Sequence, residues 1–284
     1  MILVSCRRNF DSNQFFADSN HIRRYPNLQN LQQFDTLSTG ELSAEVAGKH
    51  VLVLVHGFRN PLTNVANSYA DVEAGLVRNG LTGDRGYGIV IGFVWPGFQT
   101  AAGFFPAVPS ANRSSSYLRG LLRILGSHAT TVDVETHSLG ARVGLQALSF
   151  AGEVWVDNLL LTAPAVDDES LEPKQEFNSA LASCRRALVY HSSGDQVLKF
   201  SYRIGGLDRA LGFMGPQHRA LIERDCKDVF VVDCSQVVQS HGGYRDTDRF
   251  FDHWGRVLHE APLQQYEAID AAAPAVGAGE EAIT

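Results

Sequence analysis

Short apolar runs alternate along this chain with longer segments in which apolar residues recur at helical spacing. Several runs are continuous rather than alternating in polarity, which is typical of strands in a parallel sheet covered by helices on both faces. The runs predict strands at Ile2–Ser5, Val51–Val55, Ile89–Trp95, Val132–Thr136, Leu159–Thr162, Ala187–His191 and Val229–Asp233. The periodic segments predict helices near Asn64–Asn79, Asn112–Ser127, Leu139–Phe150, Ser170–Ser183 and Asp246–His259.

This order of elements predicts an α/β domain with a mostly parallel central sheet flanked by helices on both faces. In such sheets, functional sites form outside the carboxyl ends of the strands. The domain is expected to span residues 1–262, of which residues 1–47 are polar, aromatic and irregular. Residues 263–284 are small, acidic and without periodicity, so they are expected to form a disordered tail.

Composition narrows the classes of protein that fit. Of the 284 residues, 44% are hydrophobic and 19% are charged, which is typical of a folded domain with a sizeable core. The net charge of −7 argues against nucleic acid as a main partner. No apolar run is long enough to predict a membrane span, and the apolar start precedes its arginines, the reverse of a secretory signal. We therefore expect a cytoplasmic protein whose four scattered cysteines are free thiols.

The run Thr-His-Ser-Leu-Gly from Thr136 to Gly140 joins a predicted strand to a predicted helix. A serine at such a junction sits on a tight, strained turn that presents its hydroxyl at the carboxyl edge of the sheet. Gly140 suits this turn because a side chain there would block the close approach of helix and strand. Thr136 departs from the glycine that usually opens the motif. Ser138 is therefore the candidate nucleophile.

A serine hydroxyl needs a general base, normally histidine, and the histidine needs a carboxylate that fixes its tautomer. In sheets of this kind the three residues follow the chain order serine, acid, histidine. His241 follows the last predicted strand, and the two glycines after it would let the loop fold close over the serine. Asp195 is the preferred acid. Asp167, with Asp168 beside it, follows the preceding strand and stays open as the alternative.

The transition state of acyl transfer carries a negative oxygen that two backbone N–H groups must stabilise. One donor is expected from Leu139, directly after the nucleophile. The other is expected from Phe58, in the loop after the strand Val51–Val55. Gly57 permits a close approach of this loop, and His56 is expected to order the loop by hydrogen bonds rather than to act as a base.

The apolar loop 97–109 leaves the carboxyl end of a central strand, where it could line an acyl pocket, act as a lid, or merely cover the core or a partner surface. His137, Trp95 and Phe98 are the expected pocket residues. Such a pocket favours a small-molecule ester with an apolar acyl or aryl part. The acidic and histidine residues around His241 lack the spacing of a metal site, and no nucleotide-binding motif is present, so neither metal nor cofactor is expected.

Five motifs together resemble the alpha/beta-hydrolase superfamily over most of residues 48–260, and in detail a mostly bacterial group catalogued as a domain of unknown function. The resemblance implies a sheet of about eight strands, a Ser138–His241–Asp195 triad and an esterase-like or lipase-like serine hydrolase. Thioesterase, lipase or amidase chemistry on the same triad, or a non-catalytic binding module, are the alternatives. The motifs are Val55–Asn60, Phe93–Pro96, Thr136–Gly140, Ser193–Asp195 and His241–Tyr244.

Overall fold

The computed structural model describes residues 1–10, 15–58, 60–97, 104–150, 155–201 and 209–271. The strands are β1 (Ile2–Arg7), β2 (Phe16–Arg24), β3 (Asp35–Leu37), β4 (His50–Val55), β5 (Ile89–Val94), β6 (Thr131–His137), β7 (Val156–Thr162), β8 (Cys184–His191), β9 (Val229–Asp233) and β10 (Tyr266–Ala268). The helices are α1 (Thr39–Val46), α2 (Leu62–Arg78), α3 (Phe104–Gly126), α4 (Gly140–Leu148), α5 (Gln196–Ser201), α6 (Leu211–Met214), α7 (Arg219–Asp225) and α8 (Asp248–Leu258), with 3₁₀ helices η1 (Asn178–Ser183) and η3 (Gly243–Asp246).

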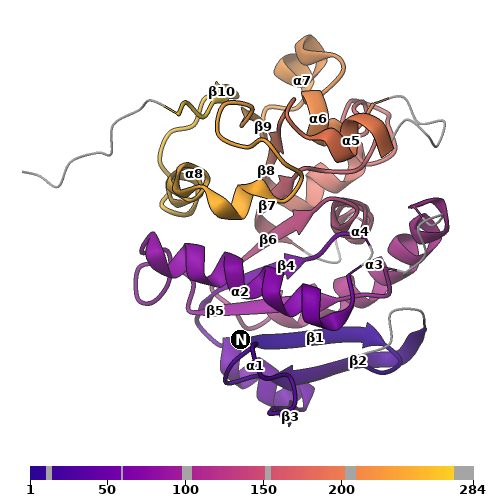
Figure 1. Ribbon diagram of the computed structural model, residues 1–284, viewed down its shortest axis with the longest axis vertical. Helices are drawn as coiled ribbons and strands as arrows, with labels where there is room; N and C mark the ends of the chain where they lie inside the picture. Colours follow the sequence, from indigo (N-terminus) through magenta and orange to yellow (C-terminus); the bar gives the residue numbers. More distant parts are fainter. Residues whose placement is uncertain (11–14, 59, 98–103, 151–154, 202–208, 272–284) are drawn as a thin grey trace, which may run out of the picture.

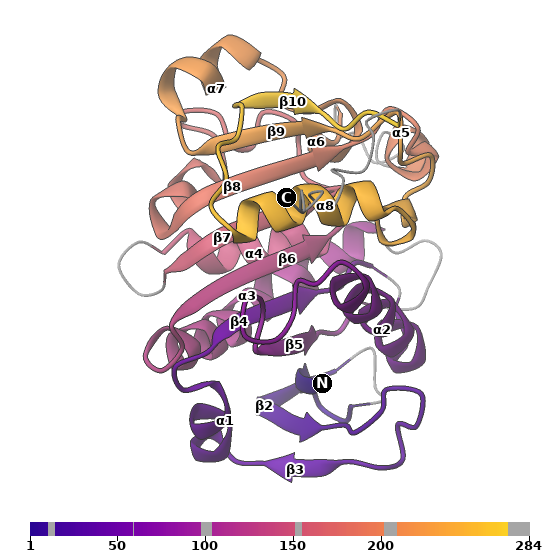
Figure 2. The ribbon, with the colours of Figure 1, turned by 90° about the vertical axis from the view of Figure 1, so that its left-hand side faces the viewer.

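All of these strands form one sheet in the order β10-β9-β8-β7-β6-β4-β5-β1-β2-β3. Figure 2 shows this order from top to bottom. Every neighbouring pair is parallel except β1 with β2 and β2 with β3. The predicted α/β class with a mostly parallel sheet is therefore confirmed. The described part of the sheet has ten strands, where about eight were expected.

Helices cover both faces of the sheet (Figure 1), with α2 and α8 on one side and α3 and α4 on the other. The strand β4 shows why its apolar run is continuous. Val51, Val53 and Val55 join the core under α3 and α4, whereas Leu52 and Leu54 join the core under α2 and α8. Because both faces are buried from Val51 to Val55, no position in this run favours a polar residue.

The amino-terminal part is more regular than its sequence indicates. Instead of an irregular segment, residues 1–47 contain three strands and the helix α1. Much of β2 is partly or fully exposed, which explains its polar residues and the absence of an apolar run. The start of α1 does have a sequence signal, since Ser38 and Glu41 form a reciprocal capping box there.

Two helix predictions need correction. Residues 170–183 form turns and the short 3₁₀ helix η1. Lys174 has a φ of 71°, in the left-handed region, which a right-handed helix cannot accommodate. The helix α3 begins at Phe104 rather than near residue 112, so residues 104–109 of the expected pocket loop are helical. The Ser110 hydroxyl donates a hydrogen bond to the Pro96 carbonyl and ties this helix to the end of β5. Residues 98–103 of that loop lie outside the described part.

The predicted domain boundary at residue 262 is wrong. Within the expected disordered tail, residues 266–268 form β10, which pairs in parallel with β9. Glu267 accepts hydrogen bonds from His253 and Arg256 of α8. A strand of three residues is too short to show a period in the sequence. Its place in the sheet depends on pairing with the backbone of β9.

Two further expectations concern the chain as a whole. All four cysteines are free, as predicted, and all four are buried. Burial raises the pKa of the Cys6 and Cys184 thiols to about 12. Among the described residues, no helix is long and apolar enough to span a bilayer.

Candidate active site

Ser138 occupies a strained turn between β6 and α4. Its φ of 57° lies in the left-handed region, which is uncommon for a residue other than glycine. The turn is held by its own backbone: the Ser138 N–H donates to the Thr162 carbonyl at 3.0 Å, and the Ser138 carbonyl accepts from Ala141 at 3.0 Å and Ala165 at 3.1 Å. Strain of this kind persists only where the surroundings enforce it, and it is common at functional sites.

Gly140 begins α4 where the helix passes over the end of β4. A Cβ atom at this position would lie 2.5 Å from the Val55 carbonyl oxygen and 2.6 Å from that of His56. Both contacts are with backbone that cannot rotate away. The expectation that this glycine permits the close approach of helix and strand is confirmed.

His241 and Asp195 are in direct contact. The His241 Nδ1 donates to the Asp195 Oδ2 at 2.6 Å, and the Asp195 side chain is fully buried. The other carboxylate oxygen, Oδ1, accepts from the Leu198 N–H at 3.0 Å and so caps α5. Because Nδ1 is the donor, the neutral His241 ring carries its lone pair on Nε2, as a general base requires.

The loops that carry this acid and this histidine are packed against each other. The Ser192 hydroxyl donates to the Val238 carbonyl at 2.6 Å. A Cβ atom on Gly194 would lie 2.9 Å from the Gln239 side chain and 3.1 Å from the Val238 carbonyl oxygen. The reason proposed for the glycines after His241 does not hold for Gly242, whose Cβ would meet open space.

The alternative acid lies elsewhere. The Asp168 carboxylate accepts a hydrogen bond from Arg209 at 2.5 Å, and burial raises the pKa of this carboxyl group in spite of the guanidinium. The backbone of Asp167 forms an isolated bridge with Ala210. Of the acids left open by the sequence, Asp195 is the one that contacts His241.

His137, which was expected to line a substrate pocket, is bound to the histidine loop. Its Nε2 donates to the backbone carbonyl of His241 at 2.8 Å, and the two rings lie 4.7 Å apart. Burial holds the pKa of His137 well below its usual range, and His241 adds to this shift. The neutral His137 ring therefore links the residue before Ser138 to the histidine loop.

The loop after β4 lies against the nucleophile at Gly57. A Cβ atom on Gly57 would lie 2.8 Å from the Ser138 Cβ, so only glycine fits at this distance. The Gly57 carbonyl accepts hydrogen bonds from the His56 Nδ1 at 2.7 Å and from the Asn60 side chain at 3.3 Å. The N–H of Phe58 belongs to the same planar trans peptide and so points the opposite way. Two side chains thus set the direction of this N–H.

His56 orders this loop, as expected. It is buried, its Nε2 accepts from the Trp95 backbone N–H at 3.1 Å, and its carbonyl accepts from the Trp95 indole at 2.7 Å. Burial, followed by the charge of Arg7, holds the pKa of His56 well below its usual range, so the ring stays neutral. Trp95 was expected to line the pocket, but it is fully buried, with its ring stacked on His56. Phe98 lies outside the described residues.

Arg7 belongs to the same edge of the sheet and has no motif that would reveal it. It ends β1 and is fully buried. Its Nε donates to the Trp95 carbonyl at 3.0 Å and its Nη2 to the Asn60 carbonyl at 2.7 Å. The only hint in the sequence is an arginine that directly follows an apolar run.

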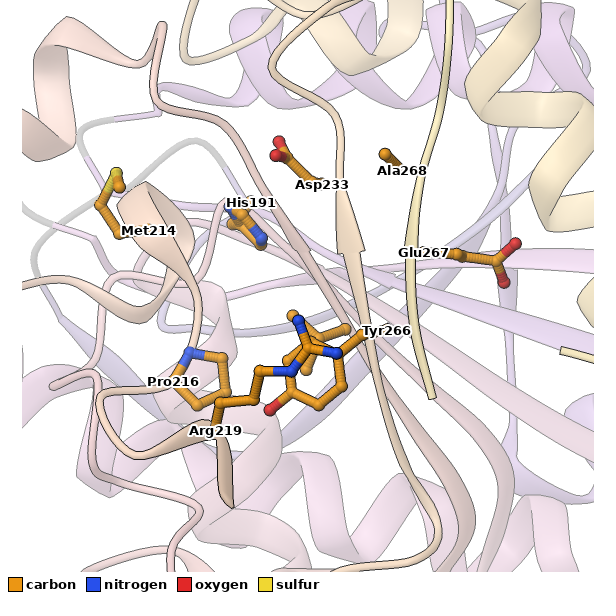
Figure 3. A pocket seen from close by; sticks show the side chains of 9 residues that line it. His191, Met214, Pro216, Arg219, Asp233, Tyr266, Glu267 and Ala268 are labelled. Atoms are coloured by element: carbon orange, nitrogen blue, oxygen red, sulfur yellow. The ribbon is translucent and has the colours of Figure 1, made fainter. Parts of the chain in front are cut away.

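A separate cavity of about 410 Å³ opens beside β8, β9 and β10 (Figure 3). The Arg219 Cζ lies 4.0 Å from the ring centre of Tyr266 in its lining. His191 and Asp233 line it from the ends of β8 and β9. None of its described lining residues is Ser138, His241 or Asp195, so this cavity is separate from the candidate triad. No group of three potential metal ligands occurs among the described residues. Its lining residues are His191, Met214, Pro216, Arg219, Val231, Asp233, Tyr266, Glu267 and Ala268.

The sheet order and the strained serine turn at its carboxyl edge define an alpha/beta hydrolase. More specifically, the chain belongs to the family described as "Alpha/beta hydrolase of unknown function (DUF900)", whose model matches residues 36–247. The strands β1 and β2 precede the matched region. No curated protein shows significant similarity to the chain.

Solved structures of similar fold include several esterases. Esterase PE8 is 14% identical, covering 77% of this chain and 95% of its own, with a TM-score of 0.48. A truncated carbohydrate esterase from gut microbiota is 13% identical, covering 76% and 86%, with a TM-score of 0.46. The lin2722 gene product of Listeria innocua is 13% identical, covering 78% and 99%, with a TM-score of 0.49. At this identity the likeness concerns the fold alone.

Proposed function

We propose that this protein is a serine hydrolase that cleaves a carboxylic ester through Ser138, His241 and Asp195. The observation that carries the proposal is the 2.6 Å contact between His241 Nδ1 and the fully buried Asp195, at the same sheet edge as the strained Ser138 turn. A buried carboxylate that orients a histidine beside a serine turn is the arrangement that acyl transfer requires. Ordinary structural roles do not require all three features together.

In this mechanism, the Ser138 hydroxyl attacks the ester carbonyl while His241 Nε2 takes its proton. The N–H groups of Phe58 and Leu139 stabilise the resulting oxyanion. His241 then returns the proton to the leaving alcohol, and an acyl-enzyme remains on Ser138. Water, activated by His241, releases the carboxylic acid and restores the serine.

The proposed substrate is a small ester with an apolar acyl or aryl part. Two large apolar side chains support this choice, because Val197 and Phe200 stand on α5 directly after Asp195 and are 47% and 58% exposed. We propose a cytoplasmic location as well, in line with the free thiols. Fractionation of the native host would test that location.

A fluorophosphonate probe tests the proposal directly. Wild type should be labelled and should hydrolyse short-chain p-nitrophenyl esters. S138A should be neither labelled nor able to hydrolyse these esters. S149A removes a serine from the other end of α4 and is the matched control, which should behave as wild type. Labelling without ester turnover, but with thioester or amide turnover, would replace the ester by one of those substrates. Folded wild type that is not labelled would favour a non-catalytic binding module.

A further inference from the structure

A buried arginine joins two segments of the catalytic edge that are far apart in the chain. Arg7 is the last residue of β1, which lies between β5 and β2 in the sheet. Its guanidinium binds the backbone of Trp95, just after β5, and that of Asn60, in the loop after β4. Both acceptors are carbonyl oxygens; the contact with Trp95 is buried, and the contact with Asn60 is partly buried.

Burial of a cation is unfavourable unless hydrogen bonds compensate for lost water. An apolar side chain of similar volume would fill the space after β1 without that cost. What the guanidinium adds is a pair of directed donors that can hold two carbonyls in fixed positions. The contribution of Arg7 therefore depends on what these two carbonyls control.

Both carbonyls lie in segments that orient the Gly57 carbonyl. The Trp95 backbone N–H binds His56 Nε2, which leaves the proton of the His56 ring on Nδ1, the atom that donates to Gly57. The Asn60 side chain is the second donor to Gly57. Arg7 thus fixes the backbone of Trp95 and Asn60, and these residues fix the donors of Gly57.

The charge of Arg7 acts in the same direction. It adds to burial in lowering the pKa of His56. A protonated His56 would lose the lone pair that accepts the Trp95 N–H, and the hydrogen bonds around Gly57 would break. Arg7 therefore favours the neutral form of His56 on which the loop depends.

We propose that Arg7 is a positioning residue for the oxyanion hole, holding the Gly57–Phe58 peptide in the direction that the transition state needs. The inference rests on the proposed ester hydrolysis. It also assigns a role in the site to β1, a strand that lies before the region matched by the family. Arg7 acts through Trp95, His56 and Asn60, and has no contact with the substrate.

The test compares R7M and R7K with wild type, with R8M as the matched control. Arg8 is the next residue and is exposed, so R8M removes the same charge from outside the site. For R7M we expect kcat for a p-nitrophenyl ester to fall about 10- to 100-fold, less than the loss of a direct oxyanion donor. KM should change by less than threefold, and the affinity for a boronic acid, which mimics the tetrahedral state, should fall in parallel with kcat. R7K should lie between R7M and wild type, and R8M should equal wild type.

A second readout does not depend on turnover. The indole N–H resonance of Trp95, identified with W95F, should shift in R7M and not in R8M, with Trp155 and Trp254 as internal references. An R7M protein that is folded and keeps both kcat and the Trp95 resonance would overturn the proposal. If R7M does not fold, R7K decides by the same criteria. Wild type without ester turnover would refute the proposed function, whereas the resonance would still show whether Arg7 orders the loop.

Discussion

Glu135 lies on β6, three residues before Ser138, and its carboxyl group is buried. It is 6% exposed, and burial raises its pKa to about 7, although the Arg245 guanidinium opposes the shift. Between the ordinary pKa of a glutamate and this raised value, the folded protein holds a proton that the unfolded chain has released. The stability of the fold must therefore decrease as pH rises through this window.

The direction of this pH dependence gives a prediction for the E135Q variant, which cannot lose the proton. From pH 5 to pH 8, wild type should lose up to about 3 kcal/mol of unfolding free energy that E135Q retains. Urea denaturation at several pH values measures the difference between the two proteins. D71N removes an exposed carboxylate from α2 and should follow wild type at every pH. Parallel pH profiles for E135Q and wild type would show that Glu135 does not hold its proton in the fold.

At the scale of elements, the contact between β6 and α4 explains the unusual threonine of the serine motif. A glycine in that position keeps the strand clear of the helix. Here Thr136 is buried, and the glycine stands on the helix instead: a Cβ atom on Gly144 would lie 2.8 Å from the Thr136 methyl group. The Thr136 hydroxyl donates to the Leu160 carbonyl at 3.3 Å. The close contact between strand and helix is kept, but the glycine that permits it is Gly144 on α4, and the larger residue is Thr136 on β6.

A double-mutant cycle tests this exchange. G144A should lower the unfolding free energy by about 1–2 kcal/mol because the new methyl group overpacks the contact. T136S removes the opposing methyl and keeps the hydroxyl, so G144A should be neutral or stabilising in the T136S background, with a coupling of at least about 1 kcal/mol. G120A, on α3, where a Cβ meets nothing within 4 Å, controls for helix propensity. Additive effects in thermal or urea unfolding would contradict this account.

At the scale of the whole molecule, the sheet depends on a partner strand that comes from the end of the described chain. Tyr266–Ala268 pairs with Val231–Asp233, and the Ile269 N–H donates to the Asp233 carbonyl at 2.9 Å. Without β10, the edge of β9 would present unpaired backbone to other chains. The strand thus closes one end of the sheet.

Two truncated chains isolate this contribution. A chain that ends at residue 262 should have an unfolding free energy about 3 kcal/mol below that of a chain that ends at residue 271, because it lacks the ladder hydrogen bonds and the packing of β10. It should also aggregate faster by light scattering, since β9 becomes an edge. Equal denaturation midpoints for the two chains would mean that β10 contributes little.

Strands could be predicted from the sequence where their apolar signal was long and regular enough. All seven predicted strands are present, because buried parallel strands read as continuous apolar runs. The strands β2, β3 and β10 were missed, since β2 is largely polar and the other two have three residues each. In the candidate site, the chain order of Ser138, Asp195 and His241 could be predicted, and the structure brings Asp195 and His241 into contact.

What the sequence determined by itself is local: the strand and helix periods, the serine turn, and the glycines at 57 and 140 that close contacts require. What only the tertiary structure decided is which hydrogen-bond partner each polar side chain has. Trp95 and His137 form hydrogen bonds with the loops of the site, and Arg7 reaches that site from the first strand. These assignments depend on hydrogen bonds between residues up to 104 positions apart, and no local pattern records such distances.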